Sequence, residues 1–451
     1  MMSRLPLSFS QSRIWLLNQI SGPDAQYNVP IVVRSRNRID ADALHEALRD
    51  VMLRHEILRT VYREADGDAV QIVREPRSVR EVMSVERLPE SLLAVRIAEI
   101  STYAFALDAE VPLRAWLLTS DSADDVVVLV THHIAVDGAS LVPLLRDLGA
   151  AYAARRDLTA PRWDPLPVQY SDFGVWQRAF LGDCADPNSV SGRQLAYWRE
   201  KLARLPVEIE LPTDRPRPQS ANFGGAEVSM PVPAGLHHQV IAVAQAERVS
   251  PFTVFHAAMA AFLSRSGAGA DIPLGGFVSG RTDAALDDLV GFFVNTLVFR
   301  LDVSAESTFR ELLRRARAVE IEAYSHQDLP FELIVKELRP IRSPSRHPLV
   351  QTAISYENAD FTALKIPGLG AEVEIAEHGR AKFDLYIRFI AGRDVGGEPT
   401  TPQMKWRYAT ALFDARTIEA MAERFIEFLG CAAVHPEQII EKLPAACSAW
   451  S

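Results

Sequence analysis

The sequence predicts an α/β protein made of two lobes, and three observations lead to this. First, a chain of 451 residues is longer than one ordinary hydrophobic core can serve. Second, each half mixes patterns typical of strands with patterns typical of covering helices, although no sequence repeat is visible. Third, a segment rich in proline and polar residues at 211–220 separates the halves. We therefore expect an N-terminal lobe over 1–180, a connecting helix and linker over 181–220 and a C-terminal lobe over 221–447.

The first half predicts helices and strands in alternation. Ile14, Leu17 and Ile20 lie at helical spacing near the N-terminus, and Asp40 is placed to cap an amphipathic helix. Alternating residues around a polar turn predict a hairpin over 60–75. The other elements expected before residue 180 are a strand at 28–36, a helix at 91–107, a strand at 111–119 paired with one from Val126, and an aromatic helix from Tyr170.

The second half shows the same mixture of elements. Its predicted elements are a strand near Ala226, helices near 233–247 and 251–266, a strand at 272–278, a core strand at 382–388 and a closing helix at 413–430. The polar stretch 392–402 is a candidate for a segment that crosses between the lobes.

Composition and charge narrow the class of protein. Hydrophobic residues make up 48% of the chain and charged residues 24%, as in ordinary globular proteins. The net charge of −10, without basic runs, argues against nucleic acid or an anionic membrane as the main partner. No apolar run is long enough to span a bilayer, and the N-terminus lacks the apolar core of a signal peptide. The three cysteines are scattered, which fits a reducing, cytoplasmic location.

The stretch from 126 to 140 contains the main candidates for site residues. Its sequence is VVVLVTHHIAVDGAS. The aliphatic run at its start predicts a strand buried on both faces. A helical pattern begins at Leu141, where Ser140 can cap the helix and Pro143 fits within the first turn. Two histidines, a carboxylate and a helix N-terminus therefore come together at the end of a buried strand.

The two histidines cannot share one role. Neighbouring residues of a strand point to opposite faces, so one of His132 and His133 faces packing and the other can face a cavity. Asp137 adds a carboxylate nearby, and Gly138 adds a backbone that a substrate can approach closely. The free N–H groups of a helix N-terminus suit developing negative charge.

Catalysis competes with packing and with metal binding as the role of these residues. A histidine at a strand end is often a packing residue. We interpret His237 and His238, which lie in a helical pattern without a following Asp-Gly, as surface or packing residues. A metal site would use His132, His133 and Asp137. We expect no metal there, because adjacent strand histidines diverge and no cysteine or further histidine lies nearby.

Seven motifs connect the chain to a known family. Residues 132–138 match the pattern HHxxxDG, and six further stretches match motifs of the same family in the same order. These are 8–11 (SxAQ, with Ser10 where alanine is usual), 54–60 (RHExLRT), 170–177 (YxDxxxWQ), 291–296 (GxFVNT), 326–332 (HQDxPFE) and 342–349 (RxxSRxPL). On these motifs the chain resembles the condensation domains of non-ribosomal peptide synthetases, among the carrier- and CoA-dependent acyltransferases.

The resemblance implies a fold, a reaction and partners. The fold has two chloramphenicol-acetyltransferase-like lobes that form a V-shaped pseudo-dimer with a tunnel between them. The reaction joins a donor aminoacyl or peptidyl thioester to the α-amine of an acceptor aminoacyl thioester. Both are carried on 4'-phosphopantetheine arms of upstream and downstream peptidyl carrier proteins, and an adenylation domain is adjacent. The domain itself binds no cofactor, is a monomer when excised, and resembles the subtype that joins an L-donor to an L-acceptor.

The resemblance also distributes roles among the candidate residues. His133 is the expected catalytic residue, which handles the acceptor amine, and the N–H region of Gly138 supports the oxyanion. His132 is expected to pack. The family places an arginine at 281 that pairs with Asp137, which makes both structural. His55 is a rival catalyst in sequence, but its motif has a structural role in the family.

Some alternatives stay open. Ala139 stands where the family often has tryptophan, which leaves the size of the acceptor pocket undecided. A relative that forms esters or epimerises is one alternative function, and an inactive recruitment platform for tailoring enzymes is another, although the HHxxxDG motif is intact. Residues 448–451 resemble the start of an affinity tag, and a natural chain end is the alternative.

Overall fold

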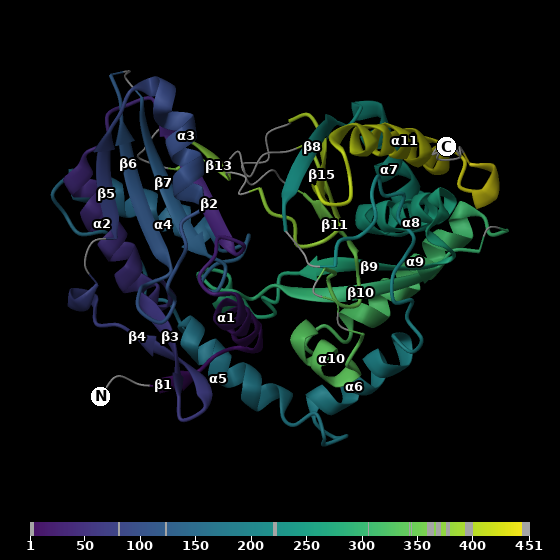
Figure 1. Ribbon diagram of the computed structural model, residues 1–451, viewed down its shortest axis with the longest axis horizontal. Coiled ribbons are helices and arrows are strands. Elements are labelled where there is room, and N and C mark those ends of the chain that lie inside the picture. Colours follow the sequence, from purple (N-terminus) through teal and green to yellow (C-terminus); the bar gives the residue numbers. More distant parts are fainter. Residues whose placement is uncertain are drawn as a thin grey trace. The chain divides into compact units, whose positions relative to one another are not determined.

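The computed structural model divides into two compact units, and each contains a mixed sheet with helices (Figure 1). Unit 1 comprises Met1–Asp183, Ser279–Val294 and Phe361–His378, and unit 2 comprises Cys184–Val278, Asn295–Asp360 and Gly379–Ser451. The α/β fold class is confirmed. The structure describes residues 4–79, 82–121, 124–219, 223–304, 306–341, 343, 345–358, 365–366, 371–375, 379–392 and 400–443.

The main sheet of unit 1 has the predicted buried strand near its centre. The strand order is β12 (Lys365–Ile366), β13 (Ala371–Ile375), β2 (Asn28–Ser35), β7 (Asp125–His132), β6 (Leu113–Thr119) and β5 (Met83–Arg87). All neighbours are antiparallel except β5 and β6. Every residue of β7 is buried, as the aliphatic run predicts. The site-bearing loop therefore leaves a rigid, fully covered strand.

Helices and a small second sheet complete unit 1. Strands β1 (Arg4–Pro6), β4 (Asp68–Val73) and β3 (Thr60–Ala65) form a three-stranded sheet, in which β3 and β4 are the predicted hairpin. The helices are α1 (Phe9–Ser21), α2 (Ala41–Arg54), α3 (Glu90–Ser101), α4 (Leu141–Arg156) and α5 (Tyr170–Leu181), with short 3₁₀ turns at Glu56–Arg59, Pro76–Ser78 and Ala284–Leu286. Asp40 caps α2 as expected, accepting from the backbone N–H groups of Asp42 and Ala43.

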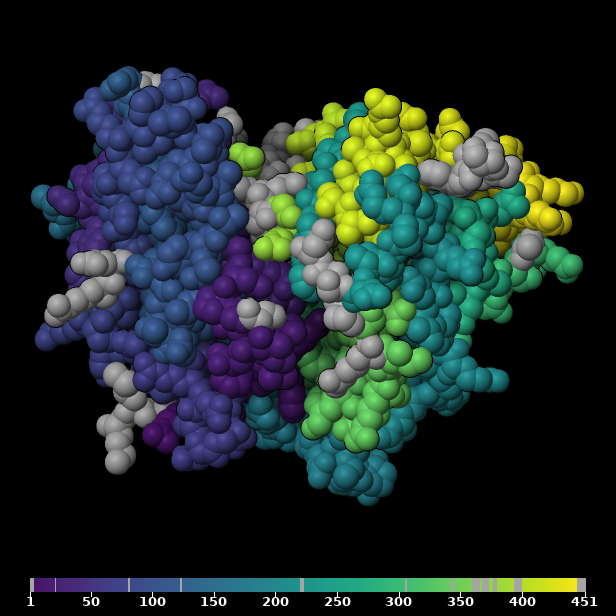
Figure 2. All heavy atoms as spheres, in the orientation of Figure 1, coloured from purple at the N-terminus to yellow at the C-terminus, as the bar shows by residue number. Residues whose placement is uncertain are grey.

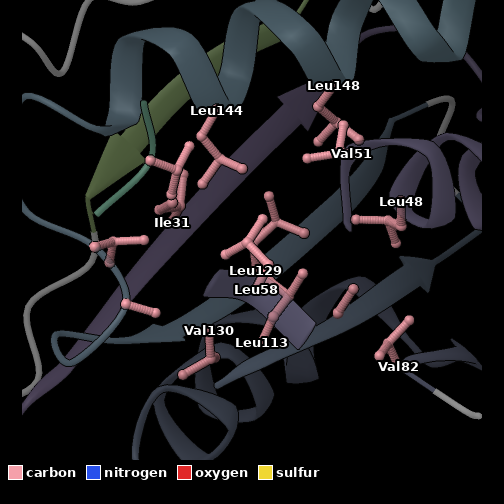
Figure 3. Packing of buried hydrophobic residues seen from close by; sticks show 14 of the residues in the cluster. Ile31, Leu48, Val51, Leu58, Val82, Leu113, Leu129, Val130, Leu144 and Leu148 are labelled. Atoms are coloured by element: carbon pink, nitrogen blue, oxygen red, sulfur yellow. The ribbon is translucent and has the colours of Figure 1, made fainter. Parts of the chain in front are cut away.

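The core of unit 1 lies between the sheet and the pair α2 and α4. Figure 3 shows side chains of Leu48 and Val51 from α2 and of Leu144 and Leu148 from α4 in one cluster with Ile31 of β2. Fully burying an aliphatic side chain of this size stabilises the fold by about 1.5–3 kcal/mol. This packing fixes the start of α4, and with it the end of the loop that follows β7.

Unit 2 has its own sheet and its own core. The strand order is β10 (Asn295–Asp302), β9 (Asp271–Val278), β11 (Thr352–Glu357), β14 (Leu385–Ile390), β15 (Gln403–Ala409) and β8 (Gly225–Pro231). The pairs β9–β11 and β11–β14 are parallel, and the other pairs are antiparallel. The helices are α6 (Val190–Lys201), α7 (Ala234–Glu247), α8 (Pro251–Leu263), α9 (Phe309–Tyr324), α10 (Phe331–Leu338) and α11 (Ala415–Val434). Helix α11, yellow in Figure 2, covers part of the surface of unit 2.

The segment expected to be a linker is fastened to unit 2. Arg217 makes two hydrogen bonds to the carboxylate of Asp384, at 2.9 and 2.5 Å. Trp198 of α6 is fully buried, and its Nε1–H donates to the carbonyl of His326 at 3.0 Å. Residues 190–219 are therefore part of the packing of unit 2 rather than a flexible connection.

The units are discontinuous in the chain, whereas the predicted boundaries follow chain order. Ser279–Val294 lies between β9 and β10 in sequence but belongs to unit 1, and the described part of Phe361–His378 adds β12 and β13 to the sheet of unit 1. A compact unit is defined by packing, which local patterns do not report. Residues 393–399 of the proposed crossing stretch, and the tag-like end at 448–451, lie outside the described residues.

Candidate functional site

The two histidines differ in burial, as expected for neighbours at a strand end. His132 is the last residue of β7 and is 1% exposed. Its ring lies 6.3 Å from the ring of Tyr27 and 5.9 Å from that of Phe105. Its Nδ1 accepts from the backbone N–H of Ile134 at 3.2 Å. This is the placement of a packing residue.

His133 is the first residue beyond β7 and is only half-buried. Its backbone N–H donates to the carbonyl of Tyr27 at 2.7 Å. Its Nδ1 lies 2.9 Å from the carbonyl oxygen of Val136. A carbonyl only accepts, so in the neutral ring Nδ1 carries the proton and Nε2 carries the lone pair. This tautomer can accept a proton at Nε2.

The predicted ion pair is present in unit 1. Arg281 lies 3.3 Å from the buried carboxylate of Asp137. The same carboxylate accepts from the backbone N–H groups of Ser140 and Phe293, both at 2.9 Å. The guanidinium also lies 4.1 Å from the centre of the Phe293 ring and donates to the carbonyl of Leu286. Asp137 therefore joins the loop after β7 to the segment 279–294.

Ser140 does not cap α4, contrary to the prediction. Its backbone is helical and its hydroxyl makes no capping bond. The fully buried Oγ instead lies 2.7 Å from a carboxylate oxygen of Asp137 and 2.8 Å from the carbonyl of Gly291. It accepts from the N–H of Gly291 at 3.0 Å and from Arg281 at 2.9 Å. The hydroxyl binds these groups rather than the helix N-terminus because these buried groups would otherwise lack a hydrogen bond.

Gly138 lies at the open side of this loop. It is exposed, and a Cβ added to it would meet nothing within 4 Å. Its carbonyl accepts from the N–H of Leu141 at 3.3 Å. Packing therefore does not require glycine here, and the backbone is open to an approaching group.

Two residues that hydrogen-bond to the site segments, Gln11 and Tyr170, were not predicted as site residues. The sequence singled them out only as members of family motifs. Gln11 donates through Nε2 to the carbonyl of Ile134 at 3.2 Å and to the hydroxyl of Tyr62 at 3.3 Å. The hydroxyl of Tyr170 donates to the carbonyl of Phe292 at 2.6 Å. Burial raises the pKa of Tyr170 well above its ordinary value, so the neutral hydroxyl acts as a donor. Their positions in the SxAQ and YxDxxxWQ motifs indicated that both residues matter, but a motif does not indicate which groups they contact.

The rival histidines have other partners. His55 is 1% exposed, and its Nε2 lies 2.9 Å from Asp147, which also pairs with Arg54. Burial is the largest influence on His55 and lowers its pKa. His237 lies on α7, 3.1 Å from the hydroxyl of Tyr356. Among the described residues, no group of three or more His, Cys, Asp or Glu could hold a metal ion.

Asn295, the asparagine of the GxFVNT motif, is hydrogen-bonded to the HQDxPFE motif within unit 2. The amide of Asn295 donates to the carbonyls of Gln327 and Leu329, at 2.8 and 2.9 Å, and accepts from the N–H of Phe331 at 2.9 Å. Arg346 pairs with Glu208 at 3.0 Å, whereas Arg342 lies outside the described residues. One side chain of the GxFVNT motif thus binds three backbone groups of the HQDxPFE motif.

Comparison with known proteins decides the family. A family model described as "Condensation domain" matches residues 1–447. The chain belongs to the condensation domain family. Its curated relatives include the probable non-canonical nonribosomal peptide synthetase CymA of Salinispora arenicola, 46% identical over 97% of this chain. A dimodular nonribosomal peptide synthase of Bacillus subtilis is 41% identical over 98% of the chain. The chain spans only 6% and 18% of the length of these two relatives.

Solved structures share the fold of this condensation domain. The X-domain from teicoplanin biosynthesis has a TM-score of 0.90 and 31% identity, with 98% of both chains covered. The first condensation domain of the CDA synthetase has a TM-score of 0.78 at 19% identity, with 98% of this chain and 99% of that one covered. The two-lobed α/β class is confirmed, whereas the V-shaped arrangement and the tunnel stay predictions. No helix among the described residues is long and apolar enough to cross a membrane.

Proposed function

We propose that this condensation domain forms an amide bond between two carrier-bound substrates. The α-amine of an acceptor aminoacyl thioester attacks the carbonyl carbon of a donor thioester. A C–N bond forms, the C–S bond breaks, and the donor arm leaves as a thiol while the lengthened chain stays on the acceptor arm. The observation that carries this proposal is the His133 ring, whose Nδ1 proton is held by Val136 at the end of a buried strand in a chain of this family.

His133 acts late in the reaction. An α-amine has a pKa of about 7.7–8.0 and an imidazole one of about 6.5, so much of the amine is already neutral near pH 7.5. The attacked nitrogen becomes far more acidic once the C–N bond has begun to form, and Nε2 then accepts its proton. Before that step, the same atom holds the amine in place, which matters because thioesters are already activated and position is the main requirement.

The other site residues support this step. The N–H region of Gly138, open to an approaching group, stabilises the oxyanion. Asp137 and Arg281 hold the loop and do not exchange protons with the substrate. His132 packs behind the strand end.

Partners follow from the chemistry. The proposal includes an upstream donor and a downstream acceptor peptidyl carrier protein, each with a 4'-phosphopantetheine arm, and an adjacent adenylation domain. It also includes a monomeric excised domain, a cytoplasmic location and joining of an L-donor to an L-acceptor.

The test is a two-carrier assay with mass spectrometry of the acceptor carrier. Unsubstituted protein should move the donor acyl group onto the acceptor amine. His133→Ala should lower the rate by about 10²- to 10⁴-fold, the usual range for general acid–base groups, while circular dichroism stays unchanged. His238→Ala, at an exposed histidine of α7, is the matched control and should keep full activity. Full activity of His133→Ala would end the proposal.

The same assay separates the alternatives. Turnover only with a hydroxyl acceptor would identify an ester-forming enzyme, and a change of configuration without transfer would identify an epimerising one. A recruitment platform would transfer nothing; the X-domain from teicoplanin biosynthesis has been solved in a complex with OxyB. The intact loop, with His133, Asp137 and Gly138 all present, supports the transferase.

A further inference from the structure

We propose that Phe292 is a positioning residue that holds the His133 imidazole in the orientation catalysis needs. This rests on the proposed role of His133. The ring centres of Phe292 and His133 lie 5.4 Å apart, with the ring planes at 61°. This separation and tilt are those of a favourable edge-to-face aromatic pair.

Phe292 limits rotation of the imidazole in addition to the bond to Val136. The torsion that turns a histidine ring has broad, roughly two-fold minima. The bond from Nδ1 to Val136 holds one edge of the ring at 2.9 Å. Phe292 contacts the ring from the segment 279–294. A half-turn of the ring would keep this contact and lose the Val136 bond, whereas a smaller turn would lose the edge-to-face geometry with Phe292. The two contacts together keep Nδ1 on the loop carbonyl and thereby fix the direction of Nε2.

The backbone on both sides of Phe292 is fixed by hydrogen bonds to Gly291, to the carbonyl of Phe292 and to Phe293. Ser140 binds Gly291 on both sides, accepting from its N–H at 3.0 Å and lying 2.8 Å from its carbonyl. Tyr170 donates to the carbonyl of Phe292 at 2.6 Å. The N–H of Phe293 donates to Asp137 at 2.9 Å. Three consecutive residues are thus fixed by side chains that are almost completely buried.

Gly291 makes this close approach possible. A Cβ at this position would lie 2.2 Å from Cδ2 of Tyr170, far inside contact distance. Tyr170 is 1% exposed and cannot move aside. Glycine is therefore required for the backbone to approach Tyr170 and Ser140 this closely. The close approach in turn keeps the backbone of Phe292 rigid.

The test compares Phe292→Leu with Phe292→Tyr. Leucine removes the ring, and we expect kcat to fall about 10- to 100-fold, the cost of a small misplacement, with KM for the loaded carriers unchanged. Tyrosine keeps the ring and should stay within about threefold of the unsubstituted rate. Phe180→Leu, at an exposed ring of α5 that stacks on Trp176, is the matched control and should have no effect.

Nitrogen NMR of His133 gives a readout that does not depend on turnover. Above neutral pH the unsubstituted protein should show the tautomer protonated at Nδ1, and Phe292→Leu should show a mixture of both tautomers. An unchanged tautomer together with unchanged kcat in Phe292→Leu would overturn the positioning role. If Phe292→Leu does not fold, Phe292→Met carries the same expectation. Failure of amide formation by the unsubstituted protein would instead overturn the proposed function, and the NMR comparison would still decide the role of Phe292.

Discussion

Asp137 illustrates how a buried carboxylate can serve architecture beside a reacting group. It accepts hydrogen bonds from two backbone N–H groups and from the Ser140 hydroxyl, and it pairs with Arg281. All of these partners are on the loop 137–140 or on the segment 279–294. The carboxylate is therefore committed to holding two distant stretches of chain together, which agrees with the proposal that His133 accepts the proton.

Removing either partner of this pair should weaken the fold. Asp137→Ala and Arg281→Ala should each lower the free energy of unfolding by about 3–5 kcal/mol, because each leaves a buried charge without its partner. The double variant should lose less than the sum, since both substitutions break the same contact. Urea unfolding measures all three. Arg87→Ala breaks an exposed pair with Asp121 and is the control, with an expected change within about 0.5 kcal/mol. Fully additive losses would contradict the pairing.

At the scale of elements, α2 and α4 are joined by a polar network within unit 1. The end of α2 supplies Arg54, and His55 follows it, while α4 supplies Asp147, which accepts from both at 2.7 and 2.9 Å. Burial opposes ionisation of Asp147, but hydrogen bonds from His55 and Arg146 outweigh it and lower its pKa. The network holds the two helices that cover the sheet carrying β7.

This network predicts a pH dependence of stability. The pKa of His55 is lowered by burial, so as pH falls below about 6.5 the unfolded chain takes up a proton that the folded chain resists. The contribution of neutral His55 is therefore full above that pH and declines below it. His55→Gln keeps an N–H donor for Asp147 and should flatten the loss of stability between about pH 7 and pH 5. Urea unfolding across this range measures the slope, and His45→Gln, on α2, is the control. An unchanged slope in His55→Gln would contradict the assignment.

At the scale of the whole molecule, the two units have separate hydrophobic cores. The core of unit 1 includes residues from 279–294, such as Leu289 and Phe293, whereas the core of unit 2 is drawn from its own segments. Separate cores allow each unit to lose stability by itself. The ion pair of Arg217 with Asp384 lies entirely within unit 2. Breaking it therefore tests whether unit 2 can lose stability without unit 1.

Arg217→Ala should therefore destabilise unit 2 selectively. Asp384 is 7% exposed at its side chain, and its pKa is raised by burial even with Arg217 present. Without Arg217 the carboxylate is left uncompensated, at a cost of about 3–5 kcal/mol. Hydrogen exchange should become faster in β14 and β15 while β7 stays protected. Arg199→Ala, at a more exposed pair with Glu337, is the control. Equal loss of protection in both units would show that they unfold together.

Local patterns in the sequence determined much of this protein. The strand from Val126, the capped helix after Asp40 and the hairpin at 60–75 are present, because burial on both faces, a side-chain cap and a polar turn act over a few neighbouring residues. The series of seven motifs is also sufficient to identify the family. The pair of Asp137 with Arg281 was expected from the family pattern rather than from the local chain.

Other features were decided only by the tertiary structure. Ser140 is an ideal cap by position, yet its hydroxyl binds Gly291, which lies 151 residues away in the chain. Nothing near either residue in sequence indicates this, because a buried hydroxyl chooses the partners that would otherwise be unsatisfied. The return of 279–294 to unit 1 and the contact of Phe292 with His133 have the same origin. Periodicity and caps are properties of a short segment, whereas the contacts that hold the His133 ring come from segments that meet only when the chain has folded.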